Sequence, residues 1–445
     1  MTTAYYPTET LLKPAVGFSL ALLVALLVAM GNLPFVVFAI TLLAVLIIQV
    51  ADNSLGSWFL ILASLHSVWS YLSVGMPGSD SSTPNNASYF ALKAFKIYFV
   101  GISAMLIAYG LSNKPTLRWR PINLQTKRFD QWTLGLAIVG SLLIAYVLYG
   151  IGFVQMILTG TFTRYFGEEQ VGSEYSLYQS LLRRGLAILI IVAPLLWLRW
   201  QQTKSKLLLL AGIVSLIFMI STVRRGPILM ALVALVLSNA VAGKHRRLIA
   251  ILLISFVVAF FVLQAFLITI DTNADTAVAS TAFVLRSATS EVNDLAWVLS
   301  EWNHRWYMGA TWLAAVWPLP ATMSNFKNTY VLTLVTKDTV GISREFEMGG
   351  LRISMFGEAY LNFGYAAVVG LGLLFGFFVR KFNGLADWAK SQGPLILFPI
   401  MFFYLAGLYQ FYLSGTATLM DSLSSFLLLA IIYRISMCKG QTFYG

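Results

Sequence analysis

Residues 206–243, KLLLLAGIVSLIFMISTVRRGPILMALVALVLSNAVAG, decide the fold class of this chain. They contain two apolar runs, 207–222 and 226–243, which are separated by a turn of only a few residues. Because apolar residues follow one another instead of alternating with polar ones, the pattern favours helices over the strands of a membrane barrel. A helix of roughly this length crosses the hydrocarbon core of a bilayer with its backbone polar groups bonded internally. The stretch therefore predicts a helical hairpin in a membrane.

Composition extends this interpretation to the whole chain. Of its 445 residues, 58% are hydrophobic and 11% are charged, whereas a soluble domain has about 25% charged residues. A soluble protein of this composition would have too few polar groups to cover its surface. We therefore predict an all-α fold, a polytopic transmembrane helix bundle that forms a single domain over residues 1–445 and has the lipid bilayer as its surroundings.

The apolar runs predict about twelve spans. Their ranges are 15–31, 33–50, 57–75, 91–111, 132–152, 181–198, 207–222, 226–243, 248–270, 359–379, 394–413 and 418–436. Lysine and arginine gather on one side of this arrangement, which the positive-inside rule makes cytoplasmic, together with both termini. The loop 51–56 has no lysine or arginine, so the topology of the first three spans stays open. The same rule explains the net charge of +12, and we expect no nucleic acid partner.

Two loops on the opposite side are long enough to hold a functional site. The smaller is 153–180, and the larger is 271–357, between the ninth and tenth spans. Loops of such length in a compact protein are usually functional or have structure of their own. We therefore expect the larger loop to be partly helical.

Arginine pairs lie where two spans reach this non-cytoplasmic side. Arg224 and Arg225 form the turn of the hairpin quoted above, and Arg183 and Arg184 begin the sixth span. Arginine costs about 2.5–3.5 kcal/mol in the centre of a bilayer on insertion scales, so a favourable partner is expected nearby. A guanidinium group matches a phosphate through paired hydrogen bonds, and lipid headgroups are the alternative partner. With Arg164 of the smaller loop, these pairs predict an anion site at the membrane surface.

The larger loop combines aromatic with ionisable side chains. Trp302, Trp306 and Tyr307 lie close to His304 in the sequence. Aromatic residues at this density are typical of an interfacial segment, in which indole rings lie at the level of the lipid headgroups. They also suit sugar recognition, because the apolar faces of sugar rings stack on aromatic rings. Both interpretations stay open. The loop also contains the arginines Arg286, Arg344 and Arg352.

Residues 357–364, GEAYLNFG, lead into the tenth predicted span. Glu358 and Asn362 are four residues apart, so we expect their side chains to share one face of a helix. A carboxylate that enters hydrocarbon needs a partner, and Arg352 or Arg224 is the natural one. Such a pair would lock the helix in place. In the other interpretation, Glu358 orients or deprotonates a sugar hydroxyl.

Three segments together resemble the bacterial Wzy-type oligosaccharide repeat-unit (O-antigen) polymerases. Residues 357–364 are similar to the Gly-Glu-x-Tyr-x-Asn-Phe-Gly signature of that family, and Gly370, Gly372 and Gly376 follow in the next span. The turn 221–227 resembles the Ser-x-x-Arg-Gly segment of the family, and 307–320 resembles part of its large periplasmic loop. Here Pro320 is followed by Ala321, where the family often has arginine.

This resemblance implies a glycosyltransferase of the lipid-linked, GT-C-like kind. Such an enzyme polymerises undecaprenyl-pyrophosphate-linked repeat units and releases undecaprenyl pyrophosphate. Donor and acceptor are both lipid-linked glycans, and a Wzz-like chain-length co-polymerase is an implied partner. The resemblance places the protein in the bacterial inner membrane, with both long loops and the active site in the periplasm. Neither a cofactor nor a metal is expected, since arginines can neutralise the leaving pyrophosphate.

The resemblance also implies roles for individual residues. The candidates for catalysis are Glu358, His304 and Arg352. Glu358 or His304 would act on the acceptor hydroxyl, and Arg352 would lie near the donor pyrophosphate or the acceptor phosphate. The candidates for binding pyrophosphate are Arg224, Arg225, Arg286, Arg344, Arg183, Arg184 and Arg164. The candidates for binding sugar are Trp302, Trp306, Tyr307, Tyr360 and Asn362.

Two other functions stay open. An O-antigen ligase shares the expected topology and an arginine-based pyrophosphate site but transfers the glycan to the lipid A core. The segment 357–364 favours the polymerase. A lipid-linked oligosaccharide flippase or a secondary transporter also commonly has twelve spans. Transporters usually place ionisable residues or broken helices near the middle of the membrane, whereas the charged residues here gather at the ends of the spans.

Overall fold

The protein is all-helical in the part of the chain that the structure describes. The computed structural model describes residues 35–51, 54–72, 87–113, 122, 124–152, 175–222, 225–242, 291–302, 306–312, 353–415 and 419–437. Within these ranges every named element is a helix. The only extended pairing among them is one isolated bridge, between Leu124 and Met437. The prediction of an all-α fold is therefore confirmed for the described residues.

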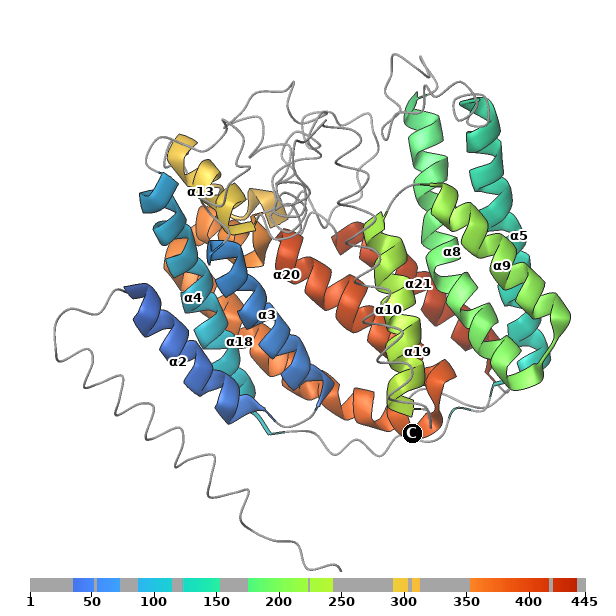
Figure 1. Ribbon diagram of the computed structural model, residues 1–445, viewed down its shortest axis with the longest axis horizontal. Coiled ribbons are helices and arrows are strands. Elements are labelled where there is room, and N and C mark those ends of the chain that lie inside the picture. Colours follow the sequence, from blue (N-terminus) through green and yellow to red (C-terminus); the bar gives the residue numbers. More distant parts are fainter. Residues whose placement is uncertain are drawn as a thin grey trace, which may run out of the picture. The chain divides into compact units, whose positions relative to one another are not determined.

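Figure 1 shows these helices in the order of the chain. They are α2 (Phe35–Val50), α3 (Leu55–Leu72), α4 (Ala87–Leu111), α5 (Thr126–Gly150), α8 (Tyr175–Thr203), α9 (Lys206–Ser221), α10 (Arg225–Ala242), α13 (Glu291–Glu301), α18 (Ser354–Gln392), α19 (Pro394–Phe402), the π-helix η2 (Phe403–Tyr409), α20 (Gln410–Ser414) and α21 (Leu419–Ser436). The helix α13 falls inside the predicted loop 271–357.

Several of these helices are suited to a bilayer. Among the described residues, five helical segments are long and apolar enough to cross a membrane, namely Tyr89–Leu111, Thr126–Gly150, Ser180–Thr203, Ser354–Gln392 and Pro394–Leu413. Shorter apolar helices lie at Lys206–Ser221, Met230–Asn239 and Ser425–Ser436. These helices indicate a membrane protein, as the composition predicted. The number of twelve spans stays a prediction, and the spans expected at 15–31 and 248–270 lie outside the described residues.

The helices also expose apolar side chains along their length. On α9, Leu210, Ile213, Ile217 and Ile220 are all exposed and follow a helical spacing of three and four residues. In water, a continuous apolar face of this kind would drive association. In a bilayer the same face meets lipid tails, so the exposure pattern agrees with the composition.

Two compact units make up the chain, and each has its own core. Unit 1 contains α2, α3, α4, α13, residues 306–312, α18 as far as Asp387, and α20. Unit 2 contains α5, α8, α9, α10, α19 and α21. The candidate site described below belongs to unit 1.

In unit 1, α4 and α18 cross at glycines. A Cβ atom built on Gly372 would lie 2.5 Å from the carbonyl oxygen of Gly101, and one built on Gly376 would overlap the carbonyl oxygen of Met105. Small residues allow this close approach of two backbones, which is the usual device for packing helices in membranes. Two of the glycines that follow the 357–364 motif, Gly372 and Gly376, are therefore explained by helix packing.

A buried polar network joins α3, α4 and α18 at the predicted cytoplasmic end of α18. The Asn383 side chain donates to Ser54 Oγ at 3.0 Å and to the Tyr109 hydroxyl at 2.7 Å, and its Oδ1 accepts from the backbone N–H of Gly56 at 2.7 Å. The Arg380 guanidinium lies over the Tyr109 ring, 4.8 Å from its centre. Buried amides and hydroxyls that bond one another in this way fix the helices without leaving unsatisfied polar atoms.

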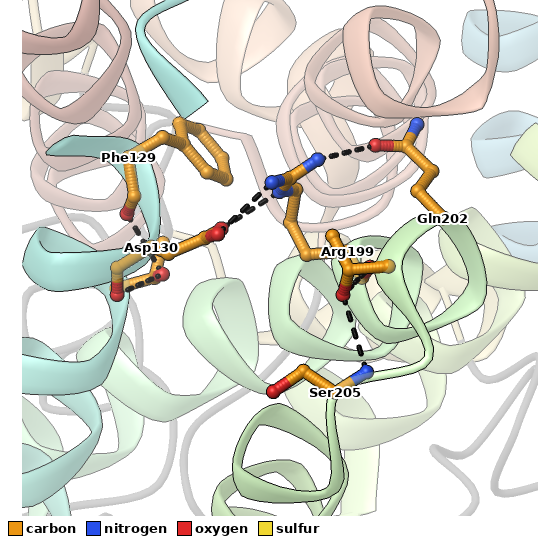
Figure 2. A network of polar contacts seen from close by, with 7 residues as sticks. Phe129, Asp130, Arg199, Gln202 and Ser205 are labelled. Carbon is orange, nitrogen blue, oxygen red and sulfur yellow. Dashed lines mark hydrogen bonds and ion pairs between the residues drawn. The ribbon is translucent and has the colours of Figure 1, made fainter. Parts of the chain in front are cut away.

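Unit 2 has an ion pair between α5 and α8, shown in Figure 2. Arg199 donates through Nε to Asp130 Oδ1 at 2.7 Å and through Nη2 to Oδ2 at 2.9 Å. Its Nη1 donates to Gln202 Oε1 at 2.7 Å. The paired contacts use the planar fork that distinguishes arginine from lysine. The Arg199 side chain is only 6% exposed, so this cation is satisfied by protein groups.

Candidate functional site

The motif 357–364 lies at the start of α18 and ends at a break in that helix. Phe363 (φ −144°, ψ 19°) and Gly364 (φ 69°, ψ −158°) both leave the helical region of backbone space. A positive φ is readily adopted by glycine because it has no Cβ atom. The helix that contains the predicted span 359–379 begins at Ser354 and is interrupted at Phe363 and Gly364, a break that was not predicted from the sequence.

Glu358 and Asn362 lie on the same face of this helical turn, as their spacing predicted. Thr311 Oγ1 donates to Glu358 Oε1 at 2.9 Å, and Asn362 Nδ2 donates to Thr311 Oγ1 at 2.7 Å. Asn362 Nδ2 also donates to the carbonyl oxygen of Glu358 at 2.8 Å. Glu358 is 1% exposed, and Asn362 and Thr311 are fully buried. The three side chains thus form one buried polar network, and Thr311 is a member that the sequence analysis missed.

The backbone of residues 306–312 is bonded to the same turn of α18. Gly309 N–H donates to Asn362 Oδ1 at 2.7 Å, and Tyr307 N–H donates to the carbonyl oxygen of Leu361 at 3.2 Å. Met308 (φ 50°) and Gly309 (φ 83°) both adopt left-handed backbone conformations, so the chain turns sharply at this point. The motif therefore holds a segment of the predicted large loop against α18.

Aromatic rings surround this attachment. Trp302 and Trp306 have ring centres 5.0 Å apart, and both pack against Tyr360, at 6.0 and 5.8 Å. Tyr365 continues the group, 5.1 Å from Tyr360. Trp302 and Tyr360 are buried, whereas Trp306 is 40% exposed and Tyr365 is 42% exposed. Two aromatic rings are thus available at the surface, and two buried rings support them. The structure brings together Trp302, Trp306 and Tyr360 of the predicted sugar-binding set.

A second buried cluster in unit 1 lies at the start of α13. His66 Nε2 and Glu291 Oε2 are 2.8 Å apart, and His66 Nδ1 lies 3.2 Å from the hydroxyl of Tyr409. The side chains of His66 and Glu291 are 9% and 1% exposed. Neither His66 nor Glu291 is among the predicted site residues. One signal was present, because His66 stands inside the predicted span 57–75, where an ionisable residue is unusual.

Of the predicted pyrophosphate-binding arginines, the described part of the chain contains Arg183, Arg184 and Arg225, so this site stays a prediction. Arg183 and Arg184 are exposed on α8 in unit 2. Arg225 begins α10, and its side chain is not among those described. The other four arginines, Arg164, Arg224, Arg286 and Arg344, lie outside the described residues, and so do the predicted catalytic residues Arg352 and His304. Among the described residues, no group of three or more histidine, cysteine or acidic side chains is placed to hold a metal ion.

Fold and site together define a helical membrane protein with a buried polar and aromatic cluster at the start of one long helix. No family model, no curated protein and no solved structure matches the chain. The resemblance to Wzy-type polymerases therefore rests on the sequence segments quoted above. Function is proposed below from those segments and from the contacts of unit 1.

Proposed function

We propose that this protein polymerises lipid-linked oligosaccharide repeat units at the non-cytoplasmic face of a bacterial inner membrane. The observation that carries the proposal is the buried Glu358–Thr311–Asn362 network. It fixes a tryptophan-bearing segment at the start of a helix long enough to span a bilayer. Aromatic side chains are typical of the membrane interface, where a substrate with a lipid anchor would present its sugar headgroup.

In the proposed reaction, a hydroxyl of the acceptor repeat unit attacks the anomeric carbon of the donor glycan. A new glycosidic C–O bond forms, and the bond from that carbon to the pyrophosphate breaks. The departing undecaprenyl pyrophosphate keeps the electron pair, and the hydroxyl proton passes to a base. Charge on the leaving group is stabilised by cations placed in advance. We assign this task to the arginines listed in the sequence analysis, with Arg224 and Arg225 binding the donor pyrophosphate.

Glu358 is the central carboxylate of the proposal. Its Oε1 accepts a hydrogen bond from Thr311, and the residue is almost fully buried. This geometry supports a role in holding the loop segment. The second role, in which Glu358 receives the hydroxyl proton, requires its charge. His304, which stands between Trp302 and Trp306 in the sequence, is the other candidate base, and Arg352 is a candidate partner of the reacting groups.

Sugar binding is proposed at the exposed aromatic rings. The Trp306 side chain is 40% exposed, and the rings of Trp302 and Tyr360 pack against it. Asn362 and Tyr307 contribute by holding the segment that carries the indole, through an amide oxygen and a backbone N–H respectively. Stacking of a sugar ring on an aromatic side chain tolerates different sugars, because the contact is made with the apolar face of the sugar and not with individual hydroxyl groups.

The proposal is tested on the surface glycans of cells that lack the gene. Extracts are separated by gel after complementation, at equal membrane levels, with wild type, Arg225→Ala, Glu358→Ala or Glu358→Gln. We expect the deletion to reduce a ladder of chain lengths to core plus one repeat unit, and Arg225→Ala and Glu358→Ala to leave it reduced. Asp387→Ala, an exposed site on the same helix far from the motif, is the matched control and should restore the ladder.

The glutamine variant separates the two roles of Glu358. Glutamine keeps an oxygen that accepts from Thr311 but cannot take up the proton of an acceptor hydroxyl. A restored ladder assigns Glu358 to positioning, and a missing ladder at normal protein levels assigns it to proton transfer. A ladder that persists in the deletion strain itself would contradict the proposed function.

Transport is the second candidate, and two observations favour it. The break at Phe363 and Gly364 interrupts a membrane-spanning helix, and His66 and Glu291 form a buried ionisable pair. Both are features that transporters place along a substrate pathway. Flippase activity predicts that lipid-linked repeat units accumulate at the cytoplasmic face of the deletion strain, whereas polymerase activity predicts accumulation at the periplasmic face. Loss of all glycan from the lipid A core would instead indicate a ligase.

A further inference from the structure

The helix α13 is joined to the bundle of unit 1 through a buried histidine–carboxylate contact at its first residue. Glu291 begins α13, and its carboxylate contacts the His66 imidazole of α3 at 2.8 Å. One residue later, the backbone N–H of Val292 donates to Ser70 Oγ of α3 at 3.0 Å. The first N–H groups of a helix have no partner within the helix. The contact with Ser70 therefore uses a backbone N–H group that only the start of α13 can offer.

The His66 ring is itself held in one orientation. Its second nitrogen, Nδ1, lies 3.2 Å from the Tyr409 hydroxyl, and the two rings meet edge to face with centres 6.0 Å apart. In the tautomer whose Nε2–H donates to the carboxylate, Nδ1 accepts a hydrogen bond from the Tyr409 hydroxyl. Each polar atom of the imidazole then has a partner, so the ring is fixed in the geometry that contacts Glu291.

The other end of α13 leads directly into the candidate site. Trp302 follows the last residue of the helix, and residues 306–312 carry Trp306 and Thr311. Between its two ends, α13 buries Val292, Leu295, Val298 and Leu299. Leu295 packs against the motif itself, since a Cβ atom built on Gly357 would lie 3.0 Å from Leu295 Cδ1. A displacement of the start of α13 would therefore be transmitted to the aromatic rings.

We propose that His66 and Glu291 are a positioning pair for the glycan site, holding α13 so that Trp302, Trp306 and Thr311 meet α18. The inference rests on the proposed function for the identity of the ligand. It assigns a role to a histidine in α3, more than 200 residues away from the site in the sequence. Neither residue is expected to touch the substrate, because the side chains of His66 and Glu291 are only 9% and 1% exposed.

Hydrogen–deuterium exchange of the full-length protein in nanodiscs tests the mechanical part of this proposal. In His66→Phe, we expect the amides of 291–301 to exchange about ten-fold faster or more, because a hydrogen bond to a charged group that held the helix is lost. Exchange near Asn383 should stay unchanged. Asn383→Leu is the matched control, since it breaks a buried network of unit 1 at the other end of α18 and should leave 291–301 unchanged.

Reconstituted polymerisation tests the functional part. We expect His66→Phe and Glu291→Gln to raise the KM for the acceptor by about ten-fold with a smaller change in kcat, because binding geometry is disturbed while the reacting groups stay in place. A pair that served stability alone would lower the amount of folded enzyme and leave KM unchanged.

The outcomes are distinct. Unchanged exchange of 291–301 in His66→Phe would overturn the proposal, and so would equally faster exchange throughout unit 1. Local faster exchange with an unchanged KM would overturn the link to the glycan site. If wild type polymerises nothing while 291–301 still responds to His66→Phe, the proposed function fails and the attachment of α13 by His66 stands.

Discussion

At the residue scale, Thr311 connects the two side chains that the sequence motif singled out. A hydroxyl can donate one hydrogen bond and accept others, and Thr311 does both, donating to Glu358 and accepting from Asn362. The sequence analysis considered arginine as the partner of Glu358, because charge was the only criterion available. Thr311 lies 47 residues before Glu358 in the chain. It is uncharged, so the sequence does not indicate that it is the partner of Glu358.

Substitution of Thr311 tests this network. Thr311→Val keeps the shape of the side chain but leaves Glu358 and Asn362 without this partner. We expect a loss of about 1–3 kcal/mol in the free energy of unfolding, the usual cost of removing a partner from a buried polar group. Thermal unfolding in detergent measures the change, and Thr311→Ser, which retains the hydroxyl, is the control. Equal unfolding temperatures for the valine and serine variants would show that the hydroxyl contributes nothing.

The candidate site was predictable from the sequence where its residues are close together. The common face of Glu358 and Asn362 follows from their spacing and is confirmed. Contact between Trp302 and Trp306 joins residues four apart in the chain. The pair of His66 and Glu291 could not be found in this way, because 225 residues separate them and only tertiary packing brings them together.

At the scale of elements, α18 contains a break that local sequence patterns do not predict. Residues 354–363 are compatible with a regular helix, and the sequence gives no cue for a break except Gly364. In the structure, Trp306 lies against Gly364, and Trp312 packs on Phe363 with ring centres 5.6 Å apart. The break therefore lies where residues 306–312 contact α18. Because these contacts come from another part of the chain, the break could not be predicted from the sequence of α18 alone.

Two glycines of α18 provide a matched pair of substitutions. Gly376→Ala places a Cβ atom against the Met105 carbonyl oxygen, so α4 and α18 must separate; we expect a loss of about 1–3 kcal/mol from overpacking. Gly370 has open space around its Cβ position, and Gly370→Ala should stabilise the helix by about 0.5–1 kcal/mol through its higher helix propensity. Thermal unfolding of both variants measures the difference. A Gly376→Ala protein as stable as Gly370→Ala would contradict the close crossing of α4 and α18.

At the scale of the whole molecule, composition and the continuity of the apolar runs together predict the fold class. A content of 58% hydrophobic and 11% charged residues indicates a membrane protein, and apolar runs without alternation indicate helices. Described helices coincide with the predicted spans from 33–50 to 226–243 and from 359–379 to 418–436, because long apolar runs have few alternatives to a helix. The orientation, the single domain and the count of twelve stay predictions. They depend on segments such as 15–31 and 248–270, which are outside the described residues.

The central claim is that the chain itself joins lipid-linked repeat units. The most direct test incubates the purified protein in proteoliposomes with the undecaprenyl-pyrophosphate-linked glycan that accumulates in the deletion strain. We predict lipid-linked products of two, three and more repeat units, one undecaprenyl pyrophosphate released for each unit added, and neither result with Glu358→Ala. Glycan that keeps its original length, with no undecaprenyl pyrophosphate released by folded wild-type protein, would contradict the claim.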